Sequence, residues 1–301
     1  MKTDRIFYLL SLLSLVFVFS ACSDDSTTMA DTQDPSITEI AALNSQFSTL
    51  VGALQATGLD ATLDGDGEFT VFAPTNDAFD ALPEGTLESL SEEQLEGILL
   101  YHALGAEVLS GQLESEQTVE TIGGENLFIT AGSAGVTVNG TASVTTADIE
   151  ARNGVIHVID NVILPDAYGT IVDNAIKRYY LSTLVDAVVQ ADLAGALSGD
   201  GPFTVFAPTN SAFAAIADVA SGLTVEELTD VLLYHVVQGK VLSSDLQPNQ
   251  EVTTLNGNPI LVEVSNSGAT VNGSASITTV DIEGVNGVIH VIDQVLLPPS
   301  E

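Results

Sequence analysis

One stretch of this chain occurs twice, and it constrains the fold more than any other feature. The first copy runs from Phe69 to Phe79 and reads Phe-Thr-Val-Phe-Ala-Pro-Thr-Asn-Asp-Ala-Phe. The second, from Phe203 to Phe213, differs only in a serine for the aspartate. The aromatic and β-branched residues predict a short buried strand, which ends at the proline because proline cannot donate a ladder hydrogen bond. The threonine and asparagine that follow can cap a helix. The chain therefore contains two copies of one module.

Helical periodicity dominates the first part of each copy. Ser36 and Glu39 form a capping box, in which each side chain satisfies a backbone N–H of the other residue. Thr170 and Asp173 repeat this arrangement in the second copy. Apolar residues recur at helical spacing from Ser36 to Leu54, so we expect one helix there.

A later helix in each copy is predicted to end in a Tyr-His pair, Tyr101-His102 and Tyr234-His235. His102 lies on the same helical stripe as Leu95 and Leu99, so its ring is expected on the apolar face and not in water. We interpret it as a core histidine that is satisfied by one hydrogen bond.

The hydrophobic period changes to two from about Val108, as expected for β-strands. Asn139-Gly140 and Asn272-Gly273 predict hairpin turns, because both central residues of such turns take positive φ. The segment 155–163 is apolar on both faces and is expected to be a central strand. The expected strands of the first copy are 108–109, 118–122, 127–131, 136–138, 143–146 and 155–163, with the same series from Val241 in the second.

Three features together resemble the fasciclin-type domains. The stretch that begins at Phe69 resembles the first signature of that family, and residues 153–165 and 286–298 resemble the second. Between them, the Tyr-His pairs match the pair typical of the family. The resemblance covers about residues 36–298. It implies an α/β (α+β) fold in each copy, with N-terminal helices packed on a twisted β-sheet wedge.

The family resemblance also implies a function. Its members are secreted or displayed at surfaces, are associated with adhesion and have no recognised active site. In animal relatives the Tyr-His pair is linked with receptor-dependent adhesion, or with loss of folding when it is disturbed. Tyr101, His102, Tyr234 and His235 are therefore candidates for an adhesion motif or a structural one.

The repeat predicts two domains, at residues 36–165 and 169–298, joined by the linker 166–168. A copy of about 130 residues buries roughly two thirds of the surface that its unfolded chain exposes, which is enough for independent folding. The linker is too short to let the domains separate freely, so we expect a semi-rigid pair.

Residues 1–21 are expected to be a lipoprotein signal peptide. Lys2 and Arg5 precede an apolar run from Ile6 to Phe19. That run is shorter than the roughly 20 residues that a membrane-spanning helix needs. The segment is therefore predicted to direct export and then to be removed.

The sequence around Cys22 resembles a bacterial lipobox, although Phe19 stands where leucine is usual. Cys22 is then the lipidated first residue of the mature chain, and residues 22–35 form an acidic tether. An ordinary signal peptide cut near Ala21 is the alternative. We expect export and lipid anchoring at the outer membrane or cell surface of a bacterium, with either membrane face open and secretion as the alternative.

The chain is strongly acidic, with 41 acidic and 6 basic residues. Removal of residues 1–21 takes away one acidic and two basic residues and leaves 40 against 4, a net charge of −36. Such a chain has no basic surface to neutralise phosphates, which excludes nucleic acid as a partner. Anionic lipid surfaces repel it as well, so the lipid anchor is the only expected contact with a membrane.

Sites for chemistry are not predicted. The chain has four histidines, and His157 and Asp160 fall on opposite faces of a strand, which defeats a shared metal ion. Residues 64–68 are acidic but lack the ligand spacing of an EF-hand, so they are interpreted as a solvated turn. No nucleophile elbow or phosphate loop occurs. We expect neither catalytic residues, nor a metal, nor a cofactor.

These observations favour a non-catalytic adhesion or matrix-interaction module. Its expected partner is a cell-surface or extracellular matrix component, either protein or polysaccharide. The alternative is a surface or periplasmic protein that binds a carbohydrate or a small ligand, or an uncharacterised enzyme.

Overall fold

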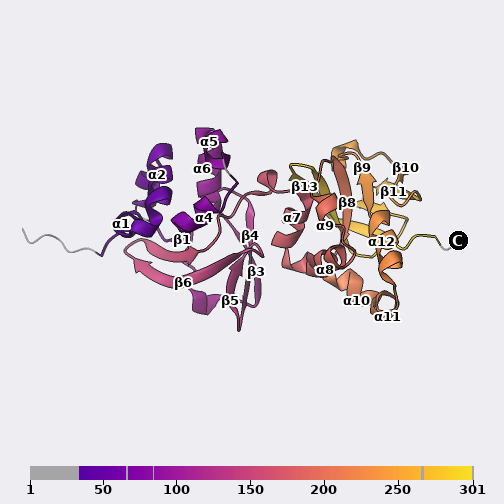
Figure 1. Cartoon of the computed structure of the whole chain (residues 1–301), viewed down its shortest axis with the longest axis horizontal. Coiled ribbons are helices and arrows are strands. Elements are labelled where there is room, and N and C mark those ends of the chain that lie inside the picture. Colours follow the sequence, from indigo (N-terminus) through magenta and orange to yellow (C-terminus); the bar gives the residue numbers. More distant parts are fainter. Residues whose placement is uncertain (1–33, 66, 84, 266–267, 300–301) are drawn as a thin grey trace, which may run out of the picture. The chain divides into compact units, whose positions relative to one another are not determined.

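The computed structural model describes residues 34–65, 67–83, 85–265 and 268–299. Within these residues, each copy of the repeat forms a set of helices and a seven-stranded sheet (Figure 1). The expected α/β (α+β) architecture with two tandem modules is confirmed. The predicted signal peptide, Cys22 and most of the predicted tether lie outside the described residues.

The two copies contain matching elements in the same order. The helices of the first copy are α1 (Ile37–Leu43), α2 (Ser48–Thr57), α3 (Leu59–Leu63), α4 (Asn76–Asp80), α5 (Thr86–Ser89) and α6 (Glu92–Tyr101). Its strands are β1 (Phe69–Pro74), β2 (Ala103–Leu104), β3 (Glu116–Glu120), β4 (Asn126–Gly132), β5 (Gly135–Val138), β6 (Ala142–Ala151) and β7 (Gly154–Ile159).

The helices of the second copy are α7 (Ile171–Lys177), α8 (Ser182–Gln190), α9 (Ala194–Leu197), α10 (Asn210–Ala215), α11 (Ala217–Ala220) and α12 (Val225–Tyr234). Its strands are β8 (Phe203–Pro208), β9 (Val236–Gln238), β10 (Gln250–Thr253), β11 (Pro259–Ser265), β12 (Gly268–Val271), β13 (Ala275–Gly284) and β14 (Gly287–Ile292).

The prediction of one helix from Ser36 to Leu54 is wrong, because two helices, α1 and α2, occupy this segment. The capping box of Ser36 and Glu39 is present with both of its hydrogen bonds. At Asn44 the backbone becomes extended, and the side-chain oxygen of this residue accepts a hydrogen bond from the backbone N–H of Gln46. Such a local bond gives the backbone an alternative to the helix, so the helix stops there.

Both sheets are mixed and share one strand order. It is β2-β1-β7-β6-β5-β4-β3 in the first copy and β9-β8-β14-β13-β12-β11-β10 in the second. β7 runs parallel to β1, with Phe72 opposite His157, and antiparallel to β6. The prediction of a central strand is therefore confirmed for residues 155–159, whereas residues 160–163 lie beyond the end of β7. The strand predicted at 108–109 is wrong, because these residues form a loop and β2 pairs with β1 instead.

The parallel centre of each sheet is buried on both faces. In the first copy, Val71 and Ile156 pack on one face with helix residues such as Leu50 of α2. Phe72 packs on the other face with residues of β4 and β5 such as Ile129. The sheet therefore folds over a second core as a wedge, with the helices outside it, and the second copy divides its core in the same way.

An Asn-Gly pair at the start of β7 holds the helices onto the sheet. The Oδ1 atom of Asn153 accepts a hydrogen bond from the N–H of Ile37 at 3.0 Å, and its Nδ2 atom donates to the Leu63 carbonyl at 2.6 Å. Gly154 has φ +141°, and a Cβ atom there would lie 1.9 Å from the carbonyl oxygen of Phe69. Only glycine permits this approach. Asn286 and Gly287 at the start of β14 make the corresponding contacts.

Both predicted hairpins are confirmed, each with a loop of three residues, because Val138 pairs with Ala142 and Val271 pairs with Ala275. Asn139 and Gly140 have φ 51° and 69° between β5 and β6, and Asn272 and Gly273 have φ 52° and 71° between β12 and β13. Positive φ at both positions gives the turn the twist of the flanking strands.

Candidate functional site

The Tyr-His pair of the first copy lies at the end of α6, inside the protein. His102 is 2% exposed. Its Nδ1 atom donates to the carbonyl of Ile98 at 2.7 Å, and its Nε2 atom accepts from the N–H of Ile163 at 3.1 Å. Because the N–H of Ile163 needs an acceptor, Nε2 carries no proton. The ring is therefore the neutral tautomer with its proton on Nδ1. The sequence predicted one hydrogen bond for this core histidine, and the structure gives it two.

His235 repeats this arrangement in the second copy. Its Nδ1 atom donates to the carbonyl of Val231 at 2.7 Å, and its Nε2 atom accepts from the N–H of Leu296 at 2.9 Å. Burial lowers the pKa of His102 and of His235 from 6.5 to about 4. Both histidines are therefore neutral at physiological pH.

The tyrosine of each pair ties its helix to the sheet. The hydroxyl of Tyr101 donates to the carbonyl of Asn126 at 3.0 Å and accepts from the Nδ2 atom of Asn139 at 2.9 Å. Burial raises the pKa of this hydroxyl. Tyr234 makes the same two bonds, to Pro259 and from Asn272. The asparagine that the sequence predicted as a turn residue is thus also the partner of the tyrosine.

The four residues of the candidate adhesion motif lie in the interior. Tyr101, His102, Tyr234 and His235 are between 1% and 4% exposed. Their polar atoms are occupied by partners within their own copy. In this conformation each pair braces a helix against a sheet, and a partner that approaches from solvent does not reach the side chains.

A second cluster of polar side chains, which the sequence did not reveal, surrounds the other histidine of each copy. Asp148 lies at an irregularity of β6 with φ 58°, a left-handed conformation that is uncommon for a residue other than glycine. Its carboxylate accepts hydrogen bonds from the backbone N–H and the hydroxyl of Ser110. These bonds hold the pKa of the Asp148 carboxyl below its usual value.

His157 completes this cluster. Its Nδ1 atom accepts from the N–H of Asp148 at 3.2 Å, and its Nε2 atom donates to the carbonyl of Val108 at 2.8 Å. The expectation that His157 is separate from Asp160 agrees with the contacts, because the Asp160 carboxylate accepts from the N–H of Ser143 instead. The second copy repeats the cluster with Ser243, Asp281 and His290.

The Ser-Asp-His cluster is arranged as a brace and not as a nucleophilic triad. A triad needs the serine hydroxyl bonded to the histidine. Here the hydroxyl of Ser110 is bonded to Asp148, and both ring nitrogens of His157 are bonded to backbone groups. The cluster therefore fastens the loop after β2 to the bulge in β6. The only signal in the sequence is the repetition of Ser, Asp and His at matching positions.

Acidic side chains far outnumber basic ones in the described residues, so most of the negative charge has no basic partner. Each of the four basic side chains in these ranges is paired with a carboxylate. Within the same ranges, no group of three or more His, Cys, Asp or Glu side chains could hold a metal ion. Every helix in the described ranges is too short or too polar to cross a membrane. The ion pairs are Arg152 with Asp64, Lys177 and Arg178 with Asp166, and Lys240 with Glu283.

Comparison with known proteins gives a consistent result. The sequence model of the Fasciclin domain matches residues 45–165 and again 180–298. Human periostin is 33% identical over 238 residues, which are 78% of this chain and 28% of periostin. Protein sll1483 of Synechocystis is 49% identical over 133 residues, 43% of this chain and 73% of that protein. The chain thus spans little more than a quarter of periostin.

Two further matches are a cell-surface relative and a solved structure. The cell surface glycolipoprotein MPB83 of Mycobacterium bovis is 34% identical over 142 residues, which are 45% of this chain and 62% of MPB83. Among solved structures, the FAS1 domain pair of the insect cell adhesion molecule fasciclin I superposes with a TM-score of 0.54. That match covers 86% of this chain and 98% of the pair at 19% sequence identity, which shows the fold alone.

Proposed function

This chain belongs to the fasciclin domain family, and from that premise we propose that it is an adhesion module displayed at the surface of a bacterial cell. The observation that carries the proposal is the presence of two fasciclin domains in one chain. A relative named as a cell surface glycolipoprotein supports the location.

The contacts inside each domain support a binding role over a catalytic one. The Tyr-His pairs and the Ser-Asp-His clusters hold loops and helices in place, and their polar atoms are bonded to groups of the same domain. The surface therefore carries the interaction. Its partner is a component of another cell surface or of the extracellular matrix, either protein or polysaccharide.

The proposed display depends on the N-terminal segment. Cys22 carries the lipid, residues 22–35 form the tether, and the domains extend over 36–165 and 169–298. Burial of an acyl chain contributes about 0.8 kcal/mol per CH₂ group, so two or more long chains hold the protein firmly at a membrane. Mass spectrometry of the mature N-terminus tests this. An unmodified terminus on protein recovered from the culture fluid contradicts it.

Two domains in one chain favour adhesion through avidity. Two linked weak sites gain about 10² to 10⁴ in avidity when both engage one target. The partner must also tolerate a mature net charge of −36, the sum of 40 acidic and 4 basic residues after residue 21. Contact through polar groups or through a basic surface satisfies this condition.

The test is an adhesion assay with the purified full chain on beads. The beads are offered to cells and to extracellular polysaccharide at low and at high salt. We expect saturable attachment that exceeds attachment of beads coated with an unrelated acidic protein of similar charge. Attachment no better than that control contradicts the adhesion proposal, and a screen for bound small molecules and for activity then tests the alternative function.

A further inference from the structure

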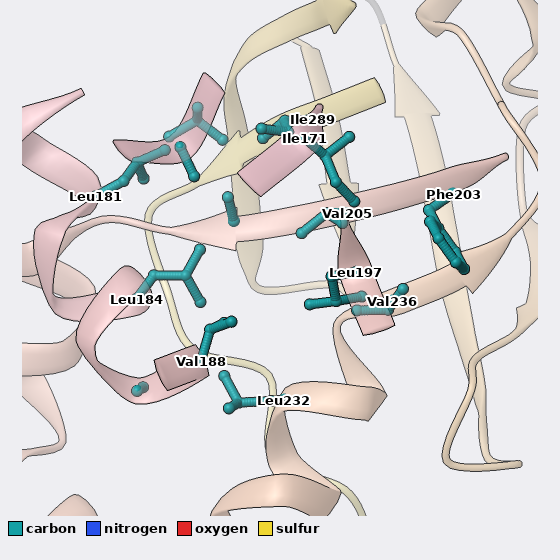
Figure 2. Close-up of a cluster of buried hydrophobic side chains, with 14 of the residues drawn as sticks. Ile171, Leu181, Leu184, Val188, Leu197, Phe203, Val205, Leu232, Val236 and Ile289 are labelled. Carbon is teal, nitrogen blue, oxygen red and sulfur yellow. The ribbon is translucent and has the colours of Figure 1, made fainter. Parts of the chain in front are cut away.

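The helical layer of the second domain encloses an apolar pocket of about 100 Å³. Side chains from α7, α8, α9 and α12 and from β8, β9 and β14 converge on it (Figure 2). Aliphatic carbon atoms form nearly all of its wall. The ring of His235 also lines it, but both ring nitrogens are bonded to backbone groups. The pocket therefore offers a ligand almost no polar contact.

The matching place in the first domain is polar. There a wider hollow is lined by Thr38, Gln55 and Asp60, among others. Positions correspond through their distance from the repeated strands β1 and β8. Three polar residues of the first domain are thus replaced by apolar ones in the second, and one leucine is replaced by a smaller valine. The corresponding pairs are Thr38 and Val172, Leu54 and Val188, Gln55 and Val189, and Asp60 and Ala194.

These replacements create and open the pocket. Leu54 is buried in the core of the first domain. Val188 stands at its place with one methylene fewer, which leaves space between α8 and the sheet. Val189 lines the pocket and is 63% exposed, so the pocket reaches the surface at this residue. An exposed valine that replaces a glutamine gives the mouth an apolar rim.

The charges near the mouth select against anions. Exposed Asp173 and Asp186 lie on α7 and α8, the two helices that frame the pocket. Lys177, also on α7, is buried and paired with Asp166. A carboxylate or phosphate at the mouth therefore meets like charge and no free cation from these helices.

We propose that this pocket of the second domain binds a small uncharged hydrocarbon group, such as a phenyl ring or the end of an alkyl chain of a neutral molecule. Apolar cavities of roughly 150 Å³ lined by aliphatic side chains stay dry and take up a benzene-sized molecule, and this pocket is of that order. The first domain, with its polar hollow, does not share the activity.

Fluorobenzene is a suitable probe, because ¹⁹F NMR of the ligand reports binding to the purified full chain. We expect saturable broadening of its resonance. Val188→Leu restores the residue of the first domain and fills the pocket, and it should weaken binding at least tenfold. The reciprocal change in the first domain, Leu54→Val, should leave binding unchanged. Fluorobenzoate, which adds a carboxylate to the same ring, should compete at least tenfold more weakly.

Ala194→Asp provides a second variant, which places a carboxylate at the pocket without added bulk in the core. Ala194→Asp should also weaken fluorobenzene binding at least tenfold. If Val188→Leu fails to fold, Ala194→Asp alone tests whether fluorobenzene binds in this pocket. Absence of saturable broadening, or equal binding by the wild-type chain and the folded pocket variants, overturns the proposal. Binding that disappears as the protein self-associates also overturns it, because the occupant is then a second copy of the chain.

Discussion

The Nε2 atom of His102 accepts a hydrogen bond from the backbone N–H of Ile163, 61 residues away in the sequence and 3.1 Å away in space. The other ring nitrogen is bonded to Ile98, one turn back in α6. The histidine thus ties the end of α6 to the segment that follows β7. Protonation of Nε2 removes the acceptor and sets a second donor against the N–H of Ile163.

The first prediction concerns pH. The pKa of His102 and of His235 is about 4 in the folded protein and 6.5 in the unfolded chain, so the unfolded state binds more protons between these values. The free energy of unfolding therefore falls as pH falls from 6.5 to 4. Each histidine contributes on the order of 3 kcal/mol to this loss, at 1.36 kcal/mol per pKa unit. Urea unfolding between pH 7.5 and pH 4 measures it.

His102→Gln serves as the control for this pH dependence. A glutamine does not titrate, so the variant is less stable at pH 7 but its first domain loses less stability on acidification. Carboxylates such as Asp166, whose pKa is lowered in the folded protein, change in the same direction and remain in the variant. An identical pH slope in the variant and in the wild type contradicts the assignment to His102.

The second prediction concerns Asn153. Asn153→Ala leaves the N–H of Ile37 and the carbonyl of Leu63 without their partner. Each unsatisfied buried group costs about 1 to 3 kcal/mol, so the loss of two partners should lower the unfolding free energy by roughly 2 to 6 kcal/mol. Asn161→Ala removes amide hydrogen bonds at an exposed site and should cost much less. Chemical denaturation measures both losses of unfolding free energy, and equal losses in the two variants refute the role of Asn153 in holding the helices onto the sheet.

The third prediction concerns Gly154, the first residue of β7. Gly154→Ala forces a Cβ atom against the carbonyl oxygen of Phe69 at positive φ, and it should unfold the first domain or lower its melting temperature severely. Gly52 lies inside α2, and a Cβ atom there meets nothing within 4 Å. Gly52→Ala should raise stability by about 0.5 to 1 kcal/mol. Scanning calorimetry compares the two, and a Gly154→Ala chain that melts like the wild type rules out the close approach.

Much of this fold is predictable from the sequence because local signals and burial agree. The capping boxes, the hairpins at Asn139 and Asn272 and the central strand around His157 each rest on chemistry within a few residues. The helix break at Asn44 was missed because the apolar residues on both sides face one core. The helical spacing of the apolar residues continues across Asn44, so the spacing alone does not show that the helix ends there.

The contacts of the candidate site were less predictable because they join distant residues. The sequence placed His102 on an apolar face, but nothing near it indicates the N–H of Ile163 as its partner. The bond of Asp148 to Ser110 depends on a bulge in β6, which the alternation of residues does not show. The two matching copies were the available signal, since Ser, Asp and His recur together in both.

The fourth prediction concerns salt. Residues 22–301 carry 40 acidic and 4 basic residues, and the four described bases are already paired, so the remaining carboxylates repel one another. The Debye length falls from about 8 Å at 0.15 M to about 3 Å at 1 M salt, so NaCl should raise the melting temperature. A melting temperature that stays flat across this range refutes the effect. A far larger effect of millimolar Ca²⁺ indicates a specific cation site instead.

The last prediction separates a structural role of the Tyr-His pairs from a direct role in adhesion. Tyr101→Phe combined with Tyr234→Phe removes only the two hydroxyl groups and leaves their partners unpaired, at about 1 to 3 kcal/mol in each domain. Domains are typically stable by about 5 to 15 kcal/mol, so both should still fold. The melting temperature should fall.

Attachment of beads coated with this doubly substituted chain is the measurement that bears most directly on whether adhesion resides on the surface of braced fasciclin domains. At a temperature where circular dichroism shows the variant folded, its beads should attach to cells as well as wild-type beads do, and both should exceed the acidic control protein. Loss of attachment by a fully folded variant would contradict this, because buried tyrosines would then be part of the adhesive contact.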